Sequence, residues 1–352
     1  MTPRTFSLLA LTTALAIAAA GYAVSREAGF TTTSRGEVIF PDLGKRINEV
    51  GKIEIRTHDR TMTMEPGEQG WALKESGGYA IQSKIVKGAI LGFSSLSYVE
   101  AKTRQADKYQ KLELRDPEAE GSHGRGVRIY AKNGDRLVDA VIGKVRYDMP
   151  GTTRDGVYIR QPGDPQTWLA LGQVDVSGLP SDWLKQEIVN IDAGRIKSAE
   201  TRHPDGAVIR VSKSSPTDRN FVMAGIPEGK KLKYDRDPDN IATVLENFEL
   251  DDARRVADIL FDPKATITTR ITTFDGLVVD INMTTRKNGR GGKSRHWVTL
   301  SARATDASSE RHKEAAGINA HTSPWAFQIP GYKASRLNKR LSEIVKDKEP
   351  GT

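Results

Sequence analysis

The stretch of sequence that decides the fold is residues 127–171, VRIYAKNGDRLVDAVIGKVRYDMPGTTRDGVYIRQPGDPQTWLAL. Residues 127–131 and 137–142 are apolar-rich runs on either side of Asn133-Gly134, a dipeptide typical of tight hairpin turns. Residues 157–160 and 168–171 form a second pair of runs around a Pro-Gly-Asp turn. The stretch therefore predicts a meander of short antiparallel strands.

The same order of strands and turns returns in a diverged form later in the chain. The landmark pairs Ile53/Ile196, Gly134/Gly276 and Trp183/Trp325 are separated by 143, 142 and 142 residues. A nearly constant period indicates an internal duplication, although strand-turn-strand patterns also recur by chance. We therefore predict an α+β protein of two tandem repeats, residues 38–192 and 193–346, each a mostly antiparallel sheet with one or two helices. Residues 347–352 form a tail.

Hydrophobic periodicity places the remaining elements. In the first repeat, strands are expected at 52–56, 61–65 and 71–73, a helix at 82–96 with Ser83 as its N-cap, and a closing helix at 183–191. In the second repeat, strands are expected at 196–202, 207–213, 221–223 and 297–302, a helix at 239–248, a hairpin at 267–283 and a C-terminal helix at 333–345.

The N-terminus carries the longest uncharged run of the chain. Arg4 and the free amine precede 19 uncharged residues at 6–24, which as a helix would span about 28 Å, close to the hydrocarbon thickness of a bilayer. The run also ends in small residues, as a cleavable signal peptide does. Residues 1–24 are therefore interpreted as a transmembrane anchor or a signal peptide, and residues 25–37 as a spacer. We expect a single-pass inner-membrane protein with its C-terminal body in the periplasm, or a periplasmic protein released by cleavage.

Composition narrows the classes of function. The 352 residues include 53 Lys and Arg against 45 Asp and Glu, and these charges are interleaved, so we expect no nucleic-acid partner. The absence of cysteine excludes disulfides, thiolate metal sites and a cysteine nucleophile. The six histidines form no H-E-x-x-H motif, and no G-x-S-x-G elbow occurs. No cofactor is predicted.

The order of landmarks resembles the bacterial domain of unknown function 4340. The residues that carry the resemblance are Phe40-Pro41, Gly70-Trp71-Ala72-Leu73, Ile142-Gly143, Gly156-Val157-Tyr158-Ile159-Arg160 and Asp182-Trp183-Leu184. The resemblance implies one N-terminal membrane segment and genes beside those of an ABC-type exporter and a gliding-motility-type auxiliary protein. It implies no catalytic residue.

A basic segment is the first candidate site. Residues 286–295, RKNGRGGKSR, carry five positive charges and no acid between two expected strands, so they predict a hairpin tip. Such a tip could contact anionic lipid headgroups, an acidic glycan or an acidic partner, or it could be a solvated loop. The candidate residues are Arg286, Lys287, Arg290, Lys293 and Arg295.

An acidic segment is the second candidate. Asp235, Asp237, Asp239 and Glu246 have the spacing of a calcium loop, but Asn240 replaces the glycine that the sharp turn needs. The alternative interpretation is that Asp239 caps the helix that follows. We therefore predict no metal site and keep these four residues only as a weak candidate.

The sequence favours a non-enzymatic, membrane-tethered periplasmic binding module. By the family resemblance, it would be auxiliary to an envelope ABC-type transport system, with the membrane and transporter subunits as partners. The alternative is an envelope carbohydrate-processing enzyme whose carboxylate pair forms only in three dimensions. Asp251-Asp252 is one such pair that sequence alone cannot evaluate.

Overall fold

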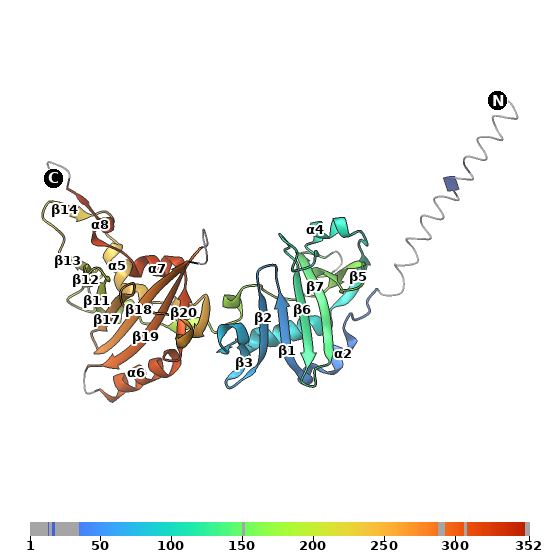
Figure 1. Ribbon diagram of the computed structural model, residues 1–352, viewed down its shortest axis with the longest axis horizontal. Coiled ribbons are helices and arrows are strands. Elements are labelled where there is room, and N and C mark those ends of the chain that lie inside the picture. Colours follow the sequence, from blue (N-terminus) through green and yellow to red (C-terminus); the bar gives the residue numbers. More distant parts are fainter. Residues whose placement is uncertain are drawn as a thin grey trace, which may run out of the picture. The chain divides into compact units, whose positions relative to one another are not determined.

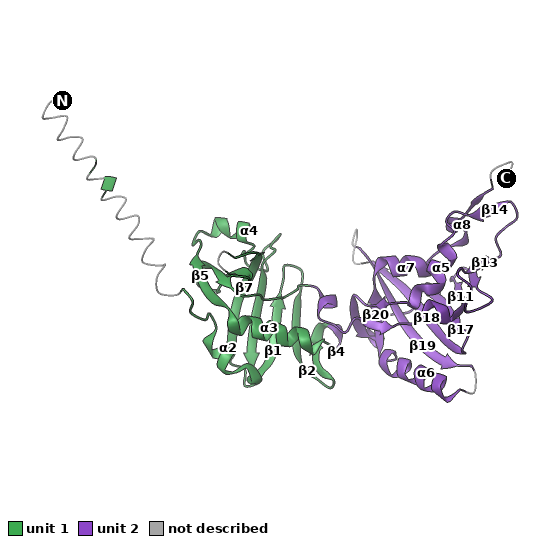
Figure 2. Ribbon diagram, turned by 180° about the vertical axis from the view of Figure 1, so that it is seen from behind, with its two compact units in different colours: residues 1–75, 80–178 green, residues 76–79, 179–352 purple. Residues whose placement is uncertain are grey.

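The computed structural model describes residues 35–149, 152–287, 293–305 and 308–348, together with residues 13, 16 and 17. The chain divides into two compact units, which we call unit 1 (Met1–Glu75 and Ala80–Gly178) and unit 2 (Ser76–Tyr79 and Leu179–Thr352) (Figure 2). The expected anchor and spacer, residues 1–37, lie almost entirely outside the described residues. Across the described part of the chain, no helix combines the length and apolar character that a membrane crossing requires.

Unit 1 is built on a nine-stranded sheet. Its strands follow the order β4-β3-β2-β1-β6-β7-β8-β9-β5, and each neighbouring pair from β3 to β5 is antiparallel (Figure 1). The strands are β1 (Val50–Arg56), β2 (Thr61–Gly67), β3 (Gly70–Leu73), β4 (Tyr79–Ala80), β5 (Ser97–Ala101), β6 (Arg125–Ala131), β7 (Arg136–Arg146), β8 (Gly156–Arg160) and β9 (Thr167–Leu171). The helices are α2 (Pro41–Lys45), α3 (Ser83–Ser95) and α4 (Tyr109–Leu112).

Helix α3 and the strands bury one apolar face each. The buried residues of α3 recur at the spacing of a single helical face: Val86, Ala89, Ile90 and Phe93. Strand alternation makes Ile53 and Ile55 of β1 almost inaccessible to solvent, and the same holds for Met62 and Met64 of β2. The intervening residues of β1 point to the opposite face and are half-exposed. The core of unit 1 therefore lies on one side of its sheet, and the other side carries polar side chains.

Unit 2 contains an eight-stranded sheet of the order β13-β12-β11-β17-β18-β19-β20-β16, again antiparallel throughout. Its strands are β11 (Ile196–Arg202), β12 (Val208–Ser212), β13 (Val222–Ala224), β16 (Asp252–Arg255), β17 (Ile267–Thr273), β18 (Leu277–Lys287), β19 (Ser294–Ala304) and β20 (Trp325–Ile329). Two smaller sheets pair β10 (Glu187–Val189) with β15 (Phe248–Glu249), and β14 (Lys230–Leu232) with β21 (Val345–Asp347). The helices are α5 (Asp237–Ala242), α6 (Ser309–Thr322), α7 (Gly331–Leu337) and α8 (Leu341–Ile344).

Helix α6 has no counterpart in the sequence prediction, and its contacts explain why. Strand β19 pairs with β20 only over His296–Val298, so the later part of β19 has no strand on that side. There, the Asn319 side chain of α6 accepts from the amide of Ala302 at 2.7 Å and donates to its carbonyl at 2.8 Å. The helix thus continues the hydrogen bonding of a strand edge. It buries little apolar surface, so hydrophobic periodicity does not reveal it.

A four-residue segment from the first half of the chain, Ser76–Tyr79, belongs to unit 2. Ser76 Oγ donates to Asp252 Oδ1 at 2.6 Å, and both residues are buried. The Tyr79 ring meets the ring of Trp325 edge-on at a centroid distance of 5.0 Å and that of Phe327 at 5.9 Å. These aromatic contacts are part of the core of unit 2.

The predicted meander is confirmed. Residues 127–142 form the hairpin of β6 and β7, and Gly134 at its turn has φ +92°, a conformation that glycine adopts at little cost. Residues 157–171 form the pair β8 and β9. The helix expected at 82–96 is α3, but Gln82 and not Ser83 occupies the N-cap position.

Three helix predictions need correction. The helix expected at 183–191 is wrong, because Trp183 is a buried core residue after a single 3-10 turn and residues 187–189 pair as β10 with the distant β15. Pairing with a remote strand overrides local periodicity there. The helix expected at 239–248 ends earlier, as α5 and a 3-10 turn at Thr243–Leu245. The C-terminal helix is split into α7 and α8, and the carbonyl of Lys339 between them accepts a hydrogen bond from His203 Nε2 at 2.9 Å.

Two of the three landmark pairs also prove to occupy different positions. Gly134 and Gly276 both sit at the turn of a long hairpin, β6–β7 and β17–β18. Trp183, by contrast, follows a 3-10 turn, whereas Trp325 opens β20. The register of β11 with β17 shifts directly after Ile196. The corresponding shift in the register of β1 with β6 follows Val50, so Val50 and not Ile53 occupies the position of Ile196.

Candidate functional site

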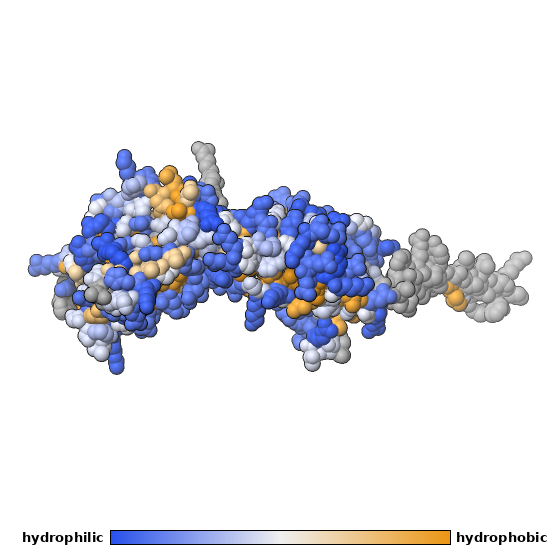
Figure 3. Space-filling view, turned by 90° about the horizontal axis from the view of Figure 1, so that it is seen from below, coloured by the Kyte–Doolittle hydropathy of each residue, from blue (hydrophilic) through white to orange (hydrophobic). Residues whose placement is uncertain are grey.

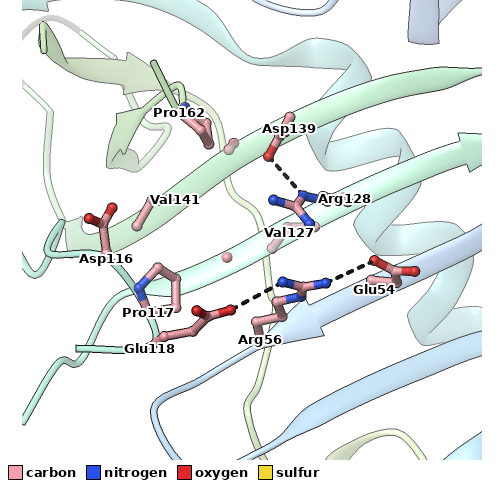
Figure 4. Close-up of a pocket in the computed structure, with 12 residues that line it drawn as sticks. Glu54, Arg56, Asp116, Pro117, Glu118, Val127, Arg128, Asp139, Val141 and Pro162 are labelled. Carbon is pink, nitrogen blue, oxygen red and sulfur yellow. Dashed lines mark hydrogen bonds and ion pairs between the residues drawn. The ribbon is translucent and has the colours of Figure 1, made fainter. Parts of the chain in front are cut away.

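The polar face of the sheet in unit 1 brings together charged side chains from three adjacent strands. Glu54 of β1 lies opposite Arg128 of β6, which lies opposite Asp139 of β7. Arg56, two residues after Glu54, points to the same face because strand side chains alternate. Figure 4 shows these four residues along neighbouring strands. We call Glu54, Arg56, Arg128 and Asp139 the charged ladder of unit 1.

Each acid of this ladder is held by basic side chains. Arg128 Nε donates to Asp139 Oδ1 at 3.3 Å, and Arg136 Nη1 lies 2.8 Å from the other oxygen of Asp139. Lys52 Nζ donates to Glu54 Oε1 at 2.8 Å. The side chains of Glu54 and Asp139 are 15% and 19% exposed, so these pairs are less screened than ordinary surface pairs.

A pocket of about 180 Å³ opens beside the ladder. The loop at 116–118 forms one wall, where Glu118 pairs with Arg56 at 3.1 Å and Pro117 adds an apolar surface (Figure 4). Pro162 lies across from it, after β8. The pocket thus combines fixed carboxylates, guanidinium groups and two proline rings, a lining that can orient a polar ligand or peptide.

The electrostatics of the ladder favour the charged forms of Glu54 and Arg128. Burial raises the pKa of Glu54, but the hydrogen bond and charge of Lys52, together with the charge of Arg56, more than offset it and leave the pKa below its ordinary value. Burial lowers the pKa of Arg128, yet Asp139 outweighs this and raises it overall. A general acid needs a pKa raised toward the working pH. These groups are therefore suited to binding and poorly suited to proton transfer.

Unit 2 carries the same arrangement on its own sheet. Glu200 of β11 lies opposite Arg270 of β17, which lies opposite Asp280 of β18, and Arg202 follows Glu200 by two residues. Arg202 Nη2 donates to Glu200 Oε1 at 2.6 Å, and Arg270 Nε donates to Asp280 Oδ1 at 2.7 Å. We call Glu200, Arg202, Arg270 and Asp280 the charged ladder of unit 2.

The acids of the second ladder are also held ionised. The hydrogen bond from Arg210 is the largest of several effects that lower the pKa of Glu200. Burial raises the pKa of Asp280, but the hydrogen bonds from Arg270 and Arg303 outweigh burial and lower it. Equivalent strands in the two units therefore present the same order of acidic and basic side chains.

The sequence-based prediction missed both ladders. The local signal is a Glu-x-Arg triplet ending the first strand of each sheet, Glu54-Ile55-Arg56 and Glu200-Thr201-Arg202. Its partners Arg128 and Asp139 are more than 70 residues away, and only the register of the sheet places them beside the triplet.

The basic segment predicted from sequence is the end of the long hairpin β18–β19. Arg286 and Arg295 lie directly opposite each other, as do Lys287 and Ser294, while Lys293 precedes β19 and Arg290 lies outside the described residues. Arg286 and Arg295 line a pocket of about 250 Å³ together with Arg254, Asp258, Ile259 and Trp297. The structure thus brings two of the five predicted residues into one pocket, and adds a third arginine that the sequence did not indicate.

The acidic candidate does not assemble. Asp235 is exposed, and Asp237 lies 3.8 Å from the ammonium of Lys339. Asp239 accepts from the amide of Phe221, and Glu246 accepts from the amide of Ala193. The capping role suggested for Asp239 is wrong, because α5 begins two residues before it and Arg236 occupies the N-cap. Within the described ranges, no group of three or more acids and histidines could hold a metal ion.

Comparison with known proteins gives one match. The family model described as "Domain of unknown function (DUF4340)" matches residues 71–269, more than half of the chain. No curated protein and no solved structure matches. The matched range includes strands of both sheets, from β3 to the first residues of β17.

Proposed function

The chain belongs to the DUF4340 family, and on that premise we propose that it is a non-enzymatic, membrane-tethered periplasmic binding module that assists an envelope ABC-type transport system. The observation that carries the binding role is the charged ladder, repeated on the polar faces of two separate sheets. An array of donors and acceptors fixed by ion pairs is preorganised for recognition of a polar partner.

We further propose that the two units arose by duplication. The strand order β3-β2-β1-β6-β7-β8-β9-β5 of unit 1 matches β13-β12-β11-β17-β18-β19-β20-β16 of unit 2, strand for strand. The shift of register near the start of β1 recurs near the start of β11. The ladders occupy the same positions in this alignment. A module with two like faces can engage a partner at two points, which raises its apparent affinity.

The membrane tether rests on the sequence. The 19 uncharged residues at 6–24 follow a basic N-terminus and precede a polar spacer, as expected for an anchor whose body is exported. If the anchor is retained, the mature chain should be found in the inner membrane, and its mass should be that of all 352 residues. A mature N-terminus near Gly21 or Val24 would instead mean release into the periplasm.

The test is chemical cross-linking of the full chain in the cells that produce it, followed by purification from solubilised membranes. We expect subunits of an ABC-type transporter to be recovered with the wild type. Recovery should fall several-fold for Arg56→Gln, since Arg56 lines the pocket beside the ladder of unit 1. The matched control is Arg46→Gln, which removes another paired arginine that does not line this pocket. If no transporter subunit is recovered with wild type, or both variants lose it equally, the proposal fails.

One observation favours the enzyme alternative. Burial, with a smaller contribution from the charge of Asp252, raises the pKa of Asp251, which is the direction that a general acid requires. Asp252, the next residue in the chain, accepts hydrogen bonds from Ser76 and Arg254. A carbohydrate-processing enzyme built on this pair would lose all turnover of envelope polysaccharide in Asp251→Asn. Polysaccharide left intact by the wild-type chain would remove the alternative.

A further inference from the structure

The pocket near the loop end of the β18–β19 hairpin concentrates positive charge. Arg286 and Arg295 are directly opposed across two antiparallel strands. Like charges in that position repel and destabilise the strand pair. Arg254, from β16, lines the same pocket, so the lining includes three arginines and one acid, Asp258.

Two of the three arginines have no acid of their own. Arg254 is neutralised by Asp252, whose Oδ1 accepts from its Nη1 at 2.7 Å. Among the residues that the structure describes, Arg286 and Arg295 take part in no ion pair. Elsewhere on the sheet of unit 2, the ion-paired arginines include Arg202, Arg270 and Arg303. Arg255 of β16 instead donates to the carbonyl of Gly77. An exchangeable anion would therefore relieve the repulsion that the chain leaves at this pocket.

The rest of the lining is apolar. Trp297 and Ile259 are buried and pack together in a small cluster with Ala326, against which Phe261 also packs. In the segment that borders the pocket, Leu260 is 70% exposed and Val256 is 38% exposed. On the face drawn in Figure 3, most of the surface is hydrophilic and the hydrophobic patches are few. Leu260 directly follows Ile259 of the lining, so an exposed apolar side chain lies next to the pocket in the chain.

We infer that this pocket binds the phosphate group of a phosphate ester, and that its source is the headgroup of an anionic phospholipid. The planar guanidinium groups of Arg286 and Arg295 would each donate two hydrogen bonds to phosphate oxygens. Leu260 would meet the apolar part of the same molecule at the membrane interface. The choice of a lipid as source rests on the membrane tether proposed above, whereas the phosphate chemistry rests on the pocket alone.

The test measures binding of three soluble probes to the purified full chain in a nonionic detergent, at constant ionic strength, by isothermal titration calorimetry. The probes are sodium phosphate, dihexanoyl phosphatidylglycerol and, as a zwitterionic control, dihexanoyl phosphatidylcholine. We expect the anionic lipid to bind more tightly than phosphate, and the zwitterionic lipid to bind most weakly. Equal affinity for phosphate and phosphatidylglycerol would support the pocket but assign it to a soluble phosphate ester.

Matched variants distinguish binding at this pocket from nonspecific attraction to the positive charge of the hairpin. Arg286→Gln and Arg295→Gln should each weaken binding tenfold or more, because each removes one guanidinium group from the lining of the pocket. Lys287→Gln removes the same charge from the same hairpin without touching the lining, and should change affinity less than threefold. Equal losses in all three variants, or no binding of any anionic probe by the wild type, would overturn the inference. Since no transporter is present, the result is independent of the cross-linking experiment.

Discussion

A buried lysine in unit 2 provides a quantitative test of the packing. Lys333 of α7 is only 3% exposed, and its Nζ donates to the carbonyl of Val244 at 2.8 Å and to that of Glu246. These carbonyls lie where the 3-10 turn after α5 ends, so the ammonium completes hydrogen bonding that the turn leaves open. Burial, reinforced by the charge of Arg336, lowers the pKa of Lys333 to about 8.

The lowered pKa makes the stability of unit 2 depend on pH with a definite sign. Lysine has an ordinary pKa of 10.5, so between pH 8 and 10.5 the unfolded chain binds more protons than the folded chain. The free energy of unfolding therefore rises with pH through that window, and the cost of burying the charged form is fully present below pH 8. From pH 7 to pH 9.5, the titration of this one group contributes about 2 kcal/mol.

The perturbation is Lys333→Met, and the assay is urea unfolding of the full chain in nonionic detergent at pH 7 and pH 9.5. The variant leaves two carbonyls without a donor, so we expect it to be less stable than the wild type at pH 9.5. The stability difference between wild type and variant should grow by about 2 kcal/mol from pH 7 to pH 9.5, because only the wild type has this group to deprotonate. A difference that stays constant, or shrinks, would refute the reasoning.

Asp280→Asn should lower the free energy of unfolding by about 1 kcal/mol, because the arginine partners of Asp280 are half-exposed and their charges are screened. In the wild type, this contribution should be lost as the pH falls below 3.8, the ordinary pKa of aspartate, and acid titration followed by circular dichroism measures both effects. Gly134→Ala and Gly276→Ala should each lower the free energy of unfolding, measured in urea, by about 1 kcal/mol, because both glycines have positive φ at a hairpin turn. A large difference between the two losses would argue against equivalent hairpins. Tyr79→Ala should cost about 3 to 5 kcal/mol by loss of ring packing in unit 2, whereas Tyr79→Phe, which keeps the ring, should cost about 1 kcal/mol in the same assay.

The elements that the sequence predicts well are those that depend on neighbours in the chain. The Asn133-Gly134 turn and the alternating runs on either side of it determine the β6–β7 hairpin locally, and the structure confirms it. Helix α3 is likewise visible in its periodic apolar residues. Helix α6 is not, because its attachment to β19 is a pair of hydrogen bonds between Asn319 and the backbone, and polar attachment leaves no periodic signal.

The candidate sites divide in the same way. The basic residues of the β18–β19 hairpin are close in sequence, and Trp297 follows Arg295 by two residues in β19, so their proximity was predictable. Arg254 of β16 joins them only through the order of strands in the sheet. The calcium-loop spacing of the acidic residues suggested a cluster that does not form. In the folded chain, Asp237, Asp239 and Glu246 contact three different partners.

By itself, the amino-acid sequence determined an α+β chain of short antiparallel strands, the family to which it belongs and the presence of a basic hairpin, because alternation, turn chemistry and charge are properties of nearby residues. Only the tertiary structure decided that Glu54, Arg128 and Asp139 form a ladder, and that Glu200, Arg270 and Asp280 form another. Cross-strand neighbours are set by register between segments that are far apart in the chain, and register is a consequence of burying one whole face of each sheet.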